Sequence, residues 1–256
     1  MRGWAMSTVA LGGSLREKFE ALAAAGFRDV ELYHDDLANG PPPVVVARMA
    51  CDLGLRISTL LPLRDCASID AFLDTACEVG AGLVVACSST LPDASARFET
   101  IAADLVALAD RAAHAGLRVG YEALPWATHI RKVEQVIAIV RLANRPNLGL
   151  VLDNFHLAWP GDGFSPLETL SADEIALVQV CDAHLDPGQD VFTQSRTARS
   201  LPGEGSLPLG PFRDAVRRTG YAGAYSLEIF NPVLRQQPAG EIARRAMLAI
   251  DRVFLT

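Results

Sequence analysis

The sequence has few cysteines, and their arrangement excludes one class of protein. Its 256 residues include five of them, scattered and odd in number: Cys51, Cys66, Cys77, Cys87 and Cys181. No two form a Cys-x-x-Cys pair, so the spacing does not suggest a disulfide framework. We therefore expect small buried side chains in a reducing compartment.

Positive charge is also scarce. The chain has 23 lysines and arginines against 30 aspartates and glutamates, which gives a formal net charge of −7 and a pI near 5.2. Nucleic-acid and anionic-membrane surfaces need a basic face, so neither is expected as a partner. A local group of arginines that binds a small anion remains compatible with this charge.

Long hydrophobic runs are missing as well. No apolar stretch approaches the roughly 18 to 20 residues of a membrane span. Ser7 and Thr8 interrupt the short apolar run of the start, "MRGWAMSTVALGGS", and a capped helix follows at once, so a first strand explains it better than a signal peptide. We expect a soluble, cytoplasmic protein. A homo-oligomer is compatible with the sequence.

The chain does contain one pattern that recurs: an amphipathic helix ends near a glycine and leads into a short apolar run that closes on polar residues. With the opening segment there are eight such runs, including "AGFRDVELYHDD", "AGLRVGYEALPW", "PNLGLVLDNFH" and "TGYAGAYSLEIFNP". Apolar strands that alternate with helices indicate a parallel sheet covered by helices. Eight units in this length predict an α/β fold, a (β/α)8 TIM barrel, as a single domain over residues 1–256. An open doubly wound sheet is the alternative, but no Gly-rich phosphate loop follows any strand.

Local signals support these helices. Gly26, Gly54, Gly80 and Gly116 fit helix C-termini, where a left-handed residue is needed. Ser14 and Glu17 have the spacing of a capping box. One long irregular insertion is expected over residues 183–210, before the last strand.

Polar residues close four consecutive predicted strands: Glu122, Asp153, Gln179 and Glu228. In a barrel of this kind the carboxyl ends of the strands converge on one mouth, where active sites form. Crowded carboxylates repel one another unless a cation or strong donors hold them. Three carboxylates and one amide oxygen suit one divalent metal ion, Mg2+ or Mn2+, although Co2+ or Zn2+ would also bind such donors.

Other candidates lie near the same mouth. His156, three residues after Asp153, is a potential general acid or base, and His129 follows another strand. Arg64, Arg196 and Arg199 would hold an anionic substrate, because guanidinium binds carboxylates through two parallel donors.

These residues resemble a known family, the xylose isomerase-like, AP-endonuclease-2-like TIM barrels, also described as sugar phosphate isomerases/epimerases. The resemblance covers essentially the whole chain. Within the family it is greatest to the bacterial 3-dehydroshikimate dehydratases, through the segments "VGYEALPW", "LGLVLDNFH", "VQVCDAH", "SRTARSLPGEG" and "GYAGAYSLEIFNP".

The resemblance implies a metal-dependent lyase that converts 3-dehydroshikimate to protocatechuate and water through a metal-stabilised enolate. It makes Glu122, Asp153, Gln179 and Glu228 the metal ligands, gives His156 an acid/base role, and places Arg64, Ser195 and Arg196 near the substrate. The sequence departs from the usual pattern at Thr197, where relatives carry histidine, and in "WATH" around His129, where they read "WGRH". Many relatives also carry a C-terminal dioxygenase-like domain that these 256 residues do not include.

Isomerisation or epimerisation of a keto sugar is the alternative, with Glu122 and Glu228 moving a proton on opposite faces of an enediolate. Its first half is the same, so the ligands alone do not separate the two reactions. The family's epimerases usually place histidine where Gln179 stands, which favours dehydration. DNA repair in this family needs a three-zinc cluster rich in histidine and a basic face, and five histidines with a net charge of −7 argue against it. A barrel that only binds a partner would hold no metal.

Overall fold

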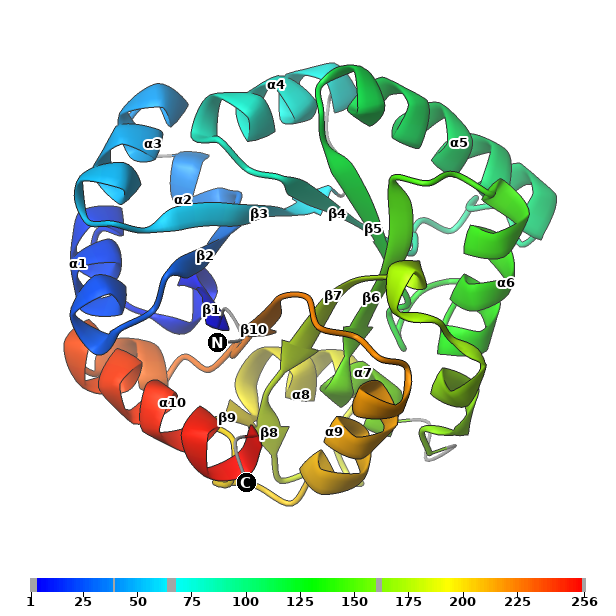
Figure 1. Ribbon diagram of the computed structural model, residues 1–256. Coiled ribbons are helices and arrows are strands. Elements are labelled where there is room, and N and C mark those ends of the chain that lie inside the picture. The colour runs from blue at the N-terminus through cyan, green and yellow to red at the C-terminus, as the bar shows by residue number, and fades with distance from the viewer. Residues whose placement is uncertain (1–3, 39, 64–67, 160–162, 255–256) are drawn as a thin grey trace.

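The structure is a computed structural model that describes residues 4–38, 40–63, 68–159 and 163–254 (Figure 1). Arg64 and Cys66 lie outside the described residues. Eight parallel strands form a closed barrel in the order β1-β10-β7-β6-β5-β4-β3-β2. Their bounds are β1 (Trp4–Ser7), β2 (Asp29–Tyr33), β3 (Arg56–Leu63), β4 (Leu83–Cys87), β5 (Arg118–Glu122), β6 (Leu148–Asp153), β7 (Ile175–Val180) and β10 (Tyr225–Leu227). The predicted TIM barrel is confirmed.

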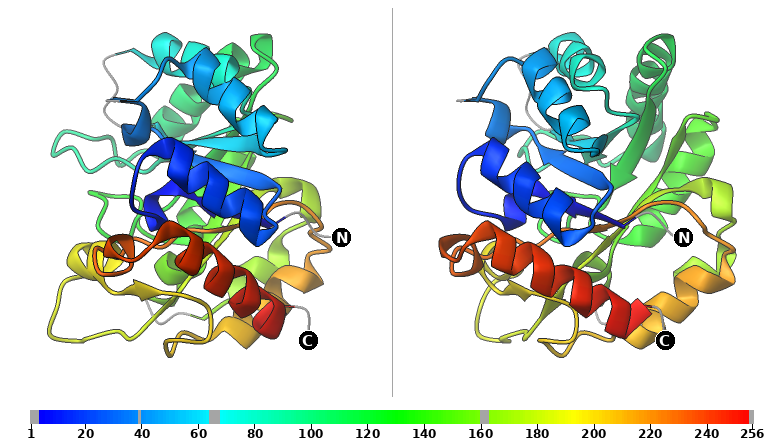
Figure 2. Two further views of the ribbon diagram at one scale, coloured as in Figure 1. Left: turned by 90° about the vertical axis from the view of Figure 1, so that its left-hand side faces the viewer. Right: turned by 60° about the vertical axis from the view of Figure 1, so that its left-hand side comes forward.

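Helices surround the barrel on its outer side, and α1 lies beside α10, where the end of the ring meets its beginning (Figures 1 and 2). The longer ones are α1 (Leu15–Ala25), α3 (Pro43–Asp52), α4 (Ile69–Val79), α5 (Phe98–His114), α6 (Val133–Ala143), α9 (Leu209–Arg218) and α10 (Ala239–Phe254). The predicted capping box between Ser14 and Glu17 opens α1, and Gly26 and Gly80 end α1 and α4 in the left-handed conformation. Short elements fill the connections: α2 (Asp35–Ala38), α7 (Asn154–Ala158), and the 3-10 turns η1 (Thr8–Ala10), η2 (Ser165–Thr169), η3 (Ala172–Glu174) and η4 (Leu234–Gln236).

The connection from β7 to β10 corrects one prediction. The sequence predicts an irregular insertion over residues 183–210, but this segment includes α8 (Val191–Thr197) and most of a small antiparallel sheet of β8 (Asp182–Ala183) and β9 (Arg199–Ser200). The carboxylate of Asp182 fastens it, because it accepts hydrogen bonds from the backbone N–H groups of Gly203 and Leu207 at 2.9 Å each. The segment is therefore ordered, and its hydrogen bonds fix the positions of α8 and β9.

Side chains inside the barrel change character along the strands. Successive residues of a strand point to opposite faces, so every second residue of each strand points inward. Leu83, Val85, Val151 and Leu177 form an apolar cluster there. Gly120 faces it, since a Cβ atom at this position would come within 2.6 Å of the Val151 side chain. Two residues beyond Val151 and Leu177, the same alternation brings polar residues inward. The apolar cluster thus forms the floor of a polar layer at the C-terminal end of the barrel.

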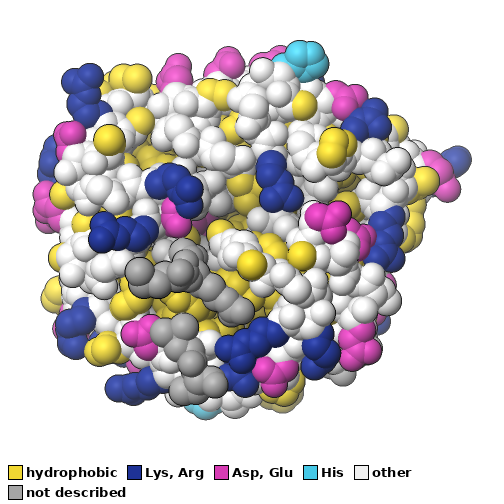
Figure 3. Space-filling model, in the orientation of Figure 1, with side chains coloured by type: hydrophobic (Ala, Val, Ile, Leu, Met, Phe, Trp, Pro, Cys, Tyr) yellow, Lys and Arg dark blue, Asp and Glu magenta, His cyan; other side chains and the backbone are white. Residues whose placement is uncertain are grey.

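The outer surface agrees with the composition. On the face in Figure 3, positively and negatively charged side chains are interspersed. Within the described residues no helix is both long and apolar enough to cross a membrane. The expectation of buried cysteines is wrong for Cys51 and Cys77, which are exposed, and Cys87 is only partly buried, whereas Cys181 is buried as expected.

Candidate active site

The polar layer collects the four predicted ligands from successive strands. Glu122 ends β5, Asp153 ends β6, Gln179 lies in β7, and Glu228 directly follows β10. Asp153 and Gln179 are paired in register across β6 and β7. No more than 5% of the surface of any of the four is exposed. The structure thus brings all four to one end of the barrel, and their role as ligands stays a prediction.

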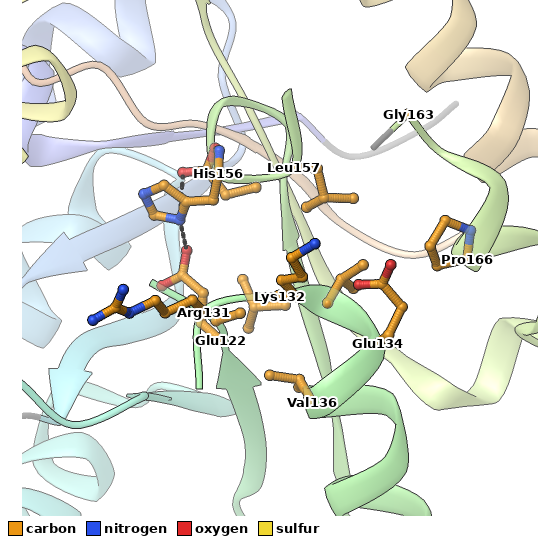
Figure 4. A pocket seen from close by; sticks show the side chains of 13 residues that line it. Glu122, Arg131, Lys132, Glu134, Val136, His156, Leu157, Gly163 and Pro166 are labelled. Carbon is orange, nitrogen blue, oxygen red and sulfur yellow. Dashed lines mark hydrogen bonds and ion pairs between the residues drawn. The ribbon is translucent and has the colours of Figure 1, made fainter. Parts of the chain in front are cut away.

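Two of the carboxylates share a histidine. His156, on α7, lies with its Nδ1 2.8 Å from Oε1 of Glu122 and 3.6 Å from Oδ2 of Asp153 (Figure 4). Ligand atoms of the three residues all lie within 4.8 Å of one another, which is compatible with one metal ion. Asp153 also caps α7 through the backbone N–H of Phe155, at 2.7 Å from Oδ1. The strand end thus fixes the helix that carries the histidine.

A buried arginine joins this group to the end of β10. Arg199 is only 1% exposed, and its Nη1 donates to Oδ2 of Asp153 at 2.7 Å and to Oε2 of Glu228 at 3.0 Å. Its other donors reach the carbonyl and the hydroxyl of Ser195 at 3.1 and 3.2 Å. Glu122, Asp153, His156, Arg199 and Glu228 are named here the β5–β6 cluster.

The contacts of His156 determine which of its nitrogens holds a proton. Its Nε2 lies 2.9 Å from Nη2 of Arg199, and a guanidinium can only donate. The Nε2 atom must therefore accept, which leaves the proton on Nδ1, where it is donated to Glu122. In this arrangement the imidazole is neutral, and Arg199 occupies the lone pair that would act as a base.

Burial and charge separate the acidities of the carboxyl groups. Burial, with help from Asp153 and Glu122, raises the pKa of Glu228 to about 7, although Arg199 opposes this. Burial also works to raise the pKa of Asp153, but the charge and the hydrogen bond of Arg199 outweigh it, so that this pKa lies below its usual value. Burial works to lower the pKa of Arg199, but the carboxylates of Asp153 and Glu228 stabilise its charged form, so this pKa is raised. At neutral pH Asp153 is therefore ionised, whereas Glu228 titrates.

A fourth buried carboxyl group, which the sequence analysis missed, lies across the barrel. Glu31 of β2 is fully buried, and its Oε2 accepts a hydrogen bond from Nε2 of Gln179 at 3.1 Å. Burial and the nearby Glu228 raise the pKa of Glu31 well above its usual value, and the polar side chains around it only partly oppose this. The available signal was a glutamate at an inward position of the apolar strand "DVELY", the same pattern as Glu228 in "YSLEI". Glu31 and Gln179 are named here the β2–β7 pair.

Aromatic side chains wall the cavity above these groups. Its lining includes Tyr33, Trp126 and Phe230, together with Glu122, His156, Ser195, Arg196, Arg199 and Glu228. The rings of Trp126 and His156 are nearly perpendicular at 5.0 Å between centroids, and the guanidinium of Arg196 lies 4.2 Å from the centroid of Phe230. Arg196 is half-buried, and its interaction with a ring face fixes the plane of its charge. Sequence reasoning did not predict this aromatic wall.

The remaining predicted substrate residues are less central. Arg199 donates two hydrogen bonds to Ser195 beside the carboxylates, so both residues support the β5–β6 cluster, and their role as substrate contacts stays a prediction. His129 is exposed and lines a neighbouring cavity of about 290 Å³ with Cys87 and Tyr121. Cys87 lines both cavities, and its thiol donates to Oε2 of Glu122 at 3.4 Å. Arg64 lies outside the described residues, and its role stays a prediction.

Comparisons with known proteins agree with this geometry. A family model described as xylose isomerase-like TIM barrel matches residues 19–253. The chain belongs to this family. Two 3-dehydroshikimate dehydratases, from Pseudomonas putida and Pseudomonas aeruginosa, are 38% and 40% identical over 93% and 91% of this chain. The chain spans 39% of the length of each.

The chain is also similar to a solved structure and to an enzyme of another name. A protein titled "xylose isomerase-like TIM barrel/4-hydroxyphenylpyruvate dioxygenase fusion protein" superposes with a TM-score of 0.94 at 35% identity, over 99% of this chain and 43% of that one. An inosose isomerase from Halalkalibacterium halodurans is 32% identical over 56% of this chain and 50% of that protein. Members of this family therefore carry names from both of the chemistries that the sequence suggested.

The residues of the polar layer fit a divalent cation. Glu31, Glu122, Asp153 and Glu228 are four buried carboxyl groups, and among the described residues only Arg199 forms an ion pair with any of them through a guanidinium or ammonium group. Oε1 of Gln179 and Oε1 of Glu31 are buried with no hydrogen-bond partner in the described part of the chain. Unpaired buried oxygens beside an excess of negative charge are costly unless a cation is present. The four predicted ligands offer only oxygen atoms, which suits a hard divalent cation.

Proposed function

We propose that this chain is a divalent-metal-dependent 3-dehydroshikimate dehydratase, a lyase that forms protocatechuate and water, with Mg2+ or Mn2+ held by Glu122, Asp153, Gln179 and Glu228. The observation that carries the proposal is the combination of this oxygen-rich layer with 38–40% identity, over nearly the whole chain, to two proteins of that name. We also propose that residues 1–256 form a single domain that carries this activity, although the relatives are longer.

The contacts of His156 in the β5–β6 cluster support this proposal. A bound divalent ion would supply a Lewis acid that polarises the ketone and stabilises negative charge on its oxygen. His156 would remove the proton next to the ketone through Nε2, once Arg199 turns its Nη2 from the ring toward substrate. Glu122 holds the opposite nitrogen at 2.8 Å and would stabilise the imidazolium that forms.

The second half of the reaction releases hydroxide, which takes a proton and leaves as water. Enolisation of the ketone then completes the aromatic ring of protocatechuate. Glu228 would handle this proton, because it lines the same cavity as His156 and accepts a hydrogen bond from Arg199. The substrate carboxylate would bind to Arg196, which lies on the cavity wall, with Arg64, His129, Ser195 and Arg199 as further predicted contacts.

The decisive experiment is to load the protein with Mn2+, add 3-dehydroshikimate and follow the absorbance of protocatechuate. We expect product with the wild type and about 10³-fold slower formation with Glu122→Gln, which keeps the hydrogen bond to His156 but cannot stabilise a charged imidazole. Glu174→Gln is the matched control, since Glu174 pairs with Arg141 outside the barrel, and its rate should equal that of the wild type. Equal rates for both variants would contradict the assignment of Glu122.

Keto-sugar isomerisation is the second candidate, favoured by the similarity to inosose isomerase. It predicts no protocatechuate, and incorporation of solvent deuterium into a ketose beside its carbonyl group. The same Mn2+-loaded sample tests both reactions, so that failure of one is interpretable against success of the other.

A further inference from the structure

The β2–β7 pair is not explained by the chemistry of the proposed reaction. Glu31 carries a carboxyl group with no exposed surface, in the middle of the molecule, on a strand that supplies none of the predicted ligands. Burying such a group without a partner costs several kcal/mol, so its position calls for a function. Its hydrogen bond within the described side chains comes from Gln179, whose Nε2 donates to Oε2 at 3.1 Å.

This hydrogen bond spans the barrel interior. β2 and β7 are separated by β1 and β10 in the strand order, and the two residues are 148 positions apart in the chain. Within the sheet, Gln179 is paired in register with Asp153 of β6 on one side and with Ser226 of β10 on the other. Glu31 therefore reaches Gln179 from the side opposite β6.

An amide side chain has two unlike ends, and only its oxygen can bind a hard cation. Oε2 of Glu31 accepts from the amide nitrogen, and the ionised carboxylate that a neighbouring cation favours would repel the amide oxygen. Glu31 thus selects the orientation in which Nε2 faces β2. Because both atoms sit on the same carbon, Oε1 of Gln179 then points away from Glu31, and it is this oxygen that is buried without a partner among the described residues.

We propose that Glu31 is a positioning residue of the metal site, which holds the amide of Gln179 so that its oxygen faces the ion. The proposal rests on the metal site of the proposed function and adds the residue that orients one of its ligands. Glu31 acts through Gln179 and does not itself bind the ion.

The test measures Mn2+ affinity of the metal-free protein, by electron paramagnetic resonance of free Mn2+, without any substrate. Glu31→Leu removes the acceptor and should weaken Mn2+ binding about 10- to 100-fold, the effect usual for partners that orient a ligand. Glu31→Gln keeps an oxygen that can accept from Nε2 and should remain within about 3-fold of the wild type. Asp29→Asn removes the same charge from the same strand, where Asp29 pairs with Arg56, and should leave the affinity unchanged.

A double-mutant cycle separates positioning from direct metal binding and from a general effect of charge. In the Gln179→Leu background there is no amide to orient, so adding Glu31→Leu should change the affinity no further. An additional loss of about 10-fold in that background would mean that Glu31 binds the ion directly or acts through its charge, and would overturn the proposal. Unchanged affinity in Glu31→Leu alone would overturn it as well.

Two controls keep the result interpretable. Circular dichroism of the metal-free variants shows whether they fold, and if Glu31→Leu does not, the swapped pair E31Q/Q179E carries the test. In that protein the amide on β2 donates to the carboxylate on β7 and leaves one carboxylate oxygen for the ion, so wild-type-like binding supports the proposal and a loss of about 10-fold contradicts it.

The outcome for the wild type separates this proposal from the proposed function. A wild type that binds Mn2+ but forms no protocatechuate refutes the proposed substrate alone. A wild type that binds no Mn2+ refutes the metal site and the positioning role of Glu31 together.

Discussion

The two sides of the polar layer differ in how their buried atoms are satisfied. In the β5–β6 cluster each acidic side chain has a cationic or hydrogen-bonding partner. A single side chain, that of Arg199, contacts Asp153, His156 and Glu228. In the β2–β7 pair one hydrogen bond joins two residues that each retain a buried, unpaired oxygen among the described side chains. The hydroxyls of Ser7 and Ser226, on the strands between them, lie near enough to Glu31 to oppose the rise in its pKa, yet neither makes a well-aligned hydrogen bond within the described chain.

This difference shows where the layer is complete and where it needs another component. The β5–β6 cluster is a closed network that holds its shape through its own charges. On the β2–β7 side, Oε1 of Gln179 is buried without a hydrogen-bond partner among the described residues, and a bound cation would satisfy it. The following predictions either break the closed network or probe the open side, beginning with the largest effect.

The largest effect on stability is expected from Arg199→Met. Methionine has a similar length and apolar stem but leaves the carboxylates of Asp153 and Glu228 buried without their cation. Removing one partner of a buried ion pair costs about 3–5 kcal/mol, so the free energy of unfolding should fall by about that amount in metal-free protein. Urea denaturation monitored by circular dichroism measures it.

The control for this variant is Arg141→Met, which removes a more exposed arginine from its pair with Glu174 and should cost under about 1 kcal/mol. Saturating Mn2+ should recover part of the loss in Arg199→Met, because the ion replaces the missing charge. Equal losses in the two variants would mean that the network contributes no more than a surface pair.

Much of this layer was predictable from the sequence. The strand-end positions of Glu122, Asp153, Gln179 and Glu228 follow from the repeated strand and helix pattern, because the parallel strands of a closed barrel must bring their carboxyl ends together. The capping box of α1 and its terminal glycine are equally local signals. Such features depend on neighbours in the chain, which the sequence displays directly.

What escaped prediction depends on contacts between distant segments. Glu31 was not predicted because it lies in the middle of β2 and not at its end, although its alternation with Val30 and Leu32 points it inward. Arg199 was predicted to bind substrate, and its inward turn onto two carboxylates depends on how α8 and β9 fold over the barrel. Trp126 of the aromatic wall, from the loop after β5, contacts Phe192 of α8 at 5.5 Å between ring centroids. The spacing of residues in the sequence does not indicate this contact between distant segments.

A smaller effect, and one with a definite pH dependence, is expected from Glu228→Gln. Burial raises the pKa of Glu228 from 4.5 to about 7, so the folded metal-free protein binds this proton more tightly than the unfolded chain. The resulting stability is fully present below about pH 4.5 and is lost as the pH rises through about 7, a change of about 3 kcal/mol. The variant lacks this contribution, and the wild type minus variant difference in unfolding free energy should decline over that range.

Other carboxyl groups shift stability in the opposite direction, so only the difference between the two proteins isolates Glu228. A flat difference across this range would show that burial does not perturb the group. Added Mn2+ should compete with the proton, so that Mn2+ affinity of the wild type rises as the pH passes about 7.

The smallest effect is expected from Ser226→Ala, which probes the open side directly. Ser226 is paired in register with Gln179, and its hydroxyl has no well-aligned hydrogen-bond partner among the described residues. Its removal deletes a buried polar group without breaking such a bond, so the free energy of unfolding of metal-free protein should change by less than about 1 kcal/mol. Ser195→Ala deletes a hydroxyl that accepts from Arg199 and should destabilise by about 1.5–3 kcal/mol, the value for a hydrogen bond to a charged group. If Ser226→Ala costs as much as Ser195→Ala, the open side is already satisfied in the metal-free protein, and the contrast between the two sides of the layer disappears.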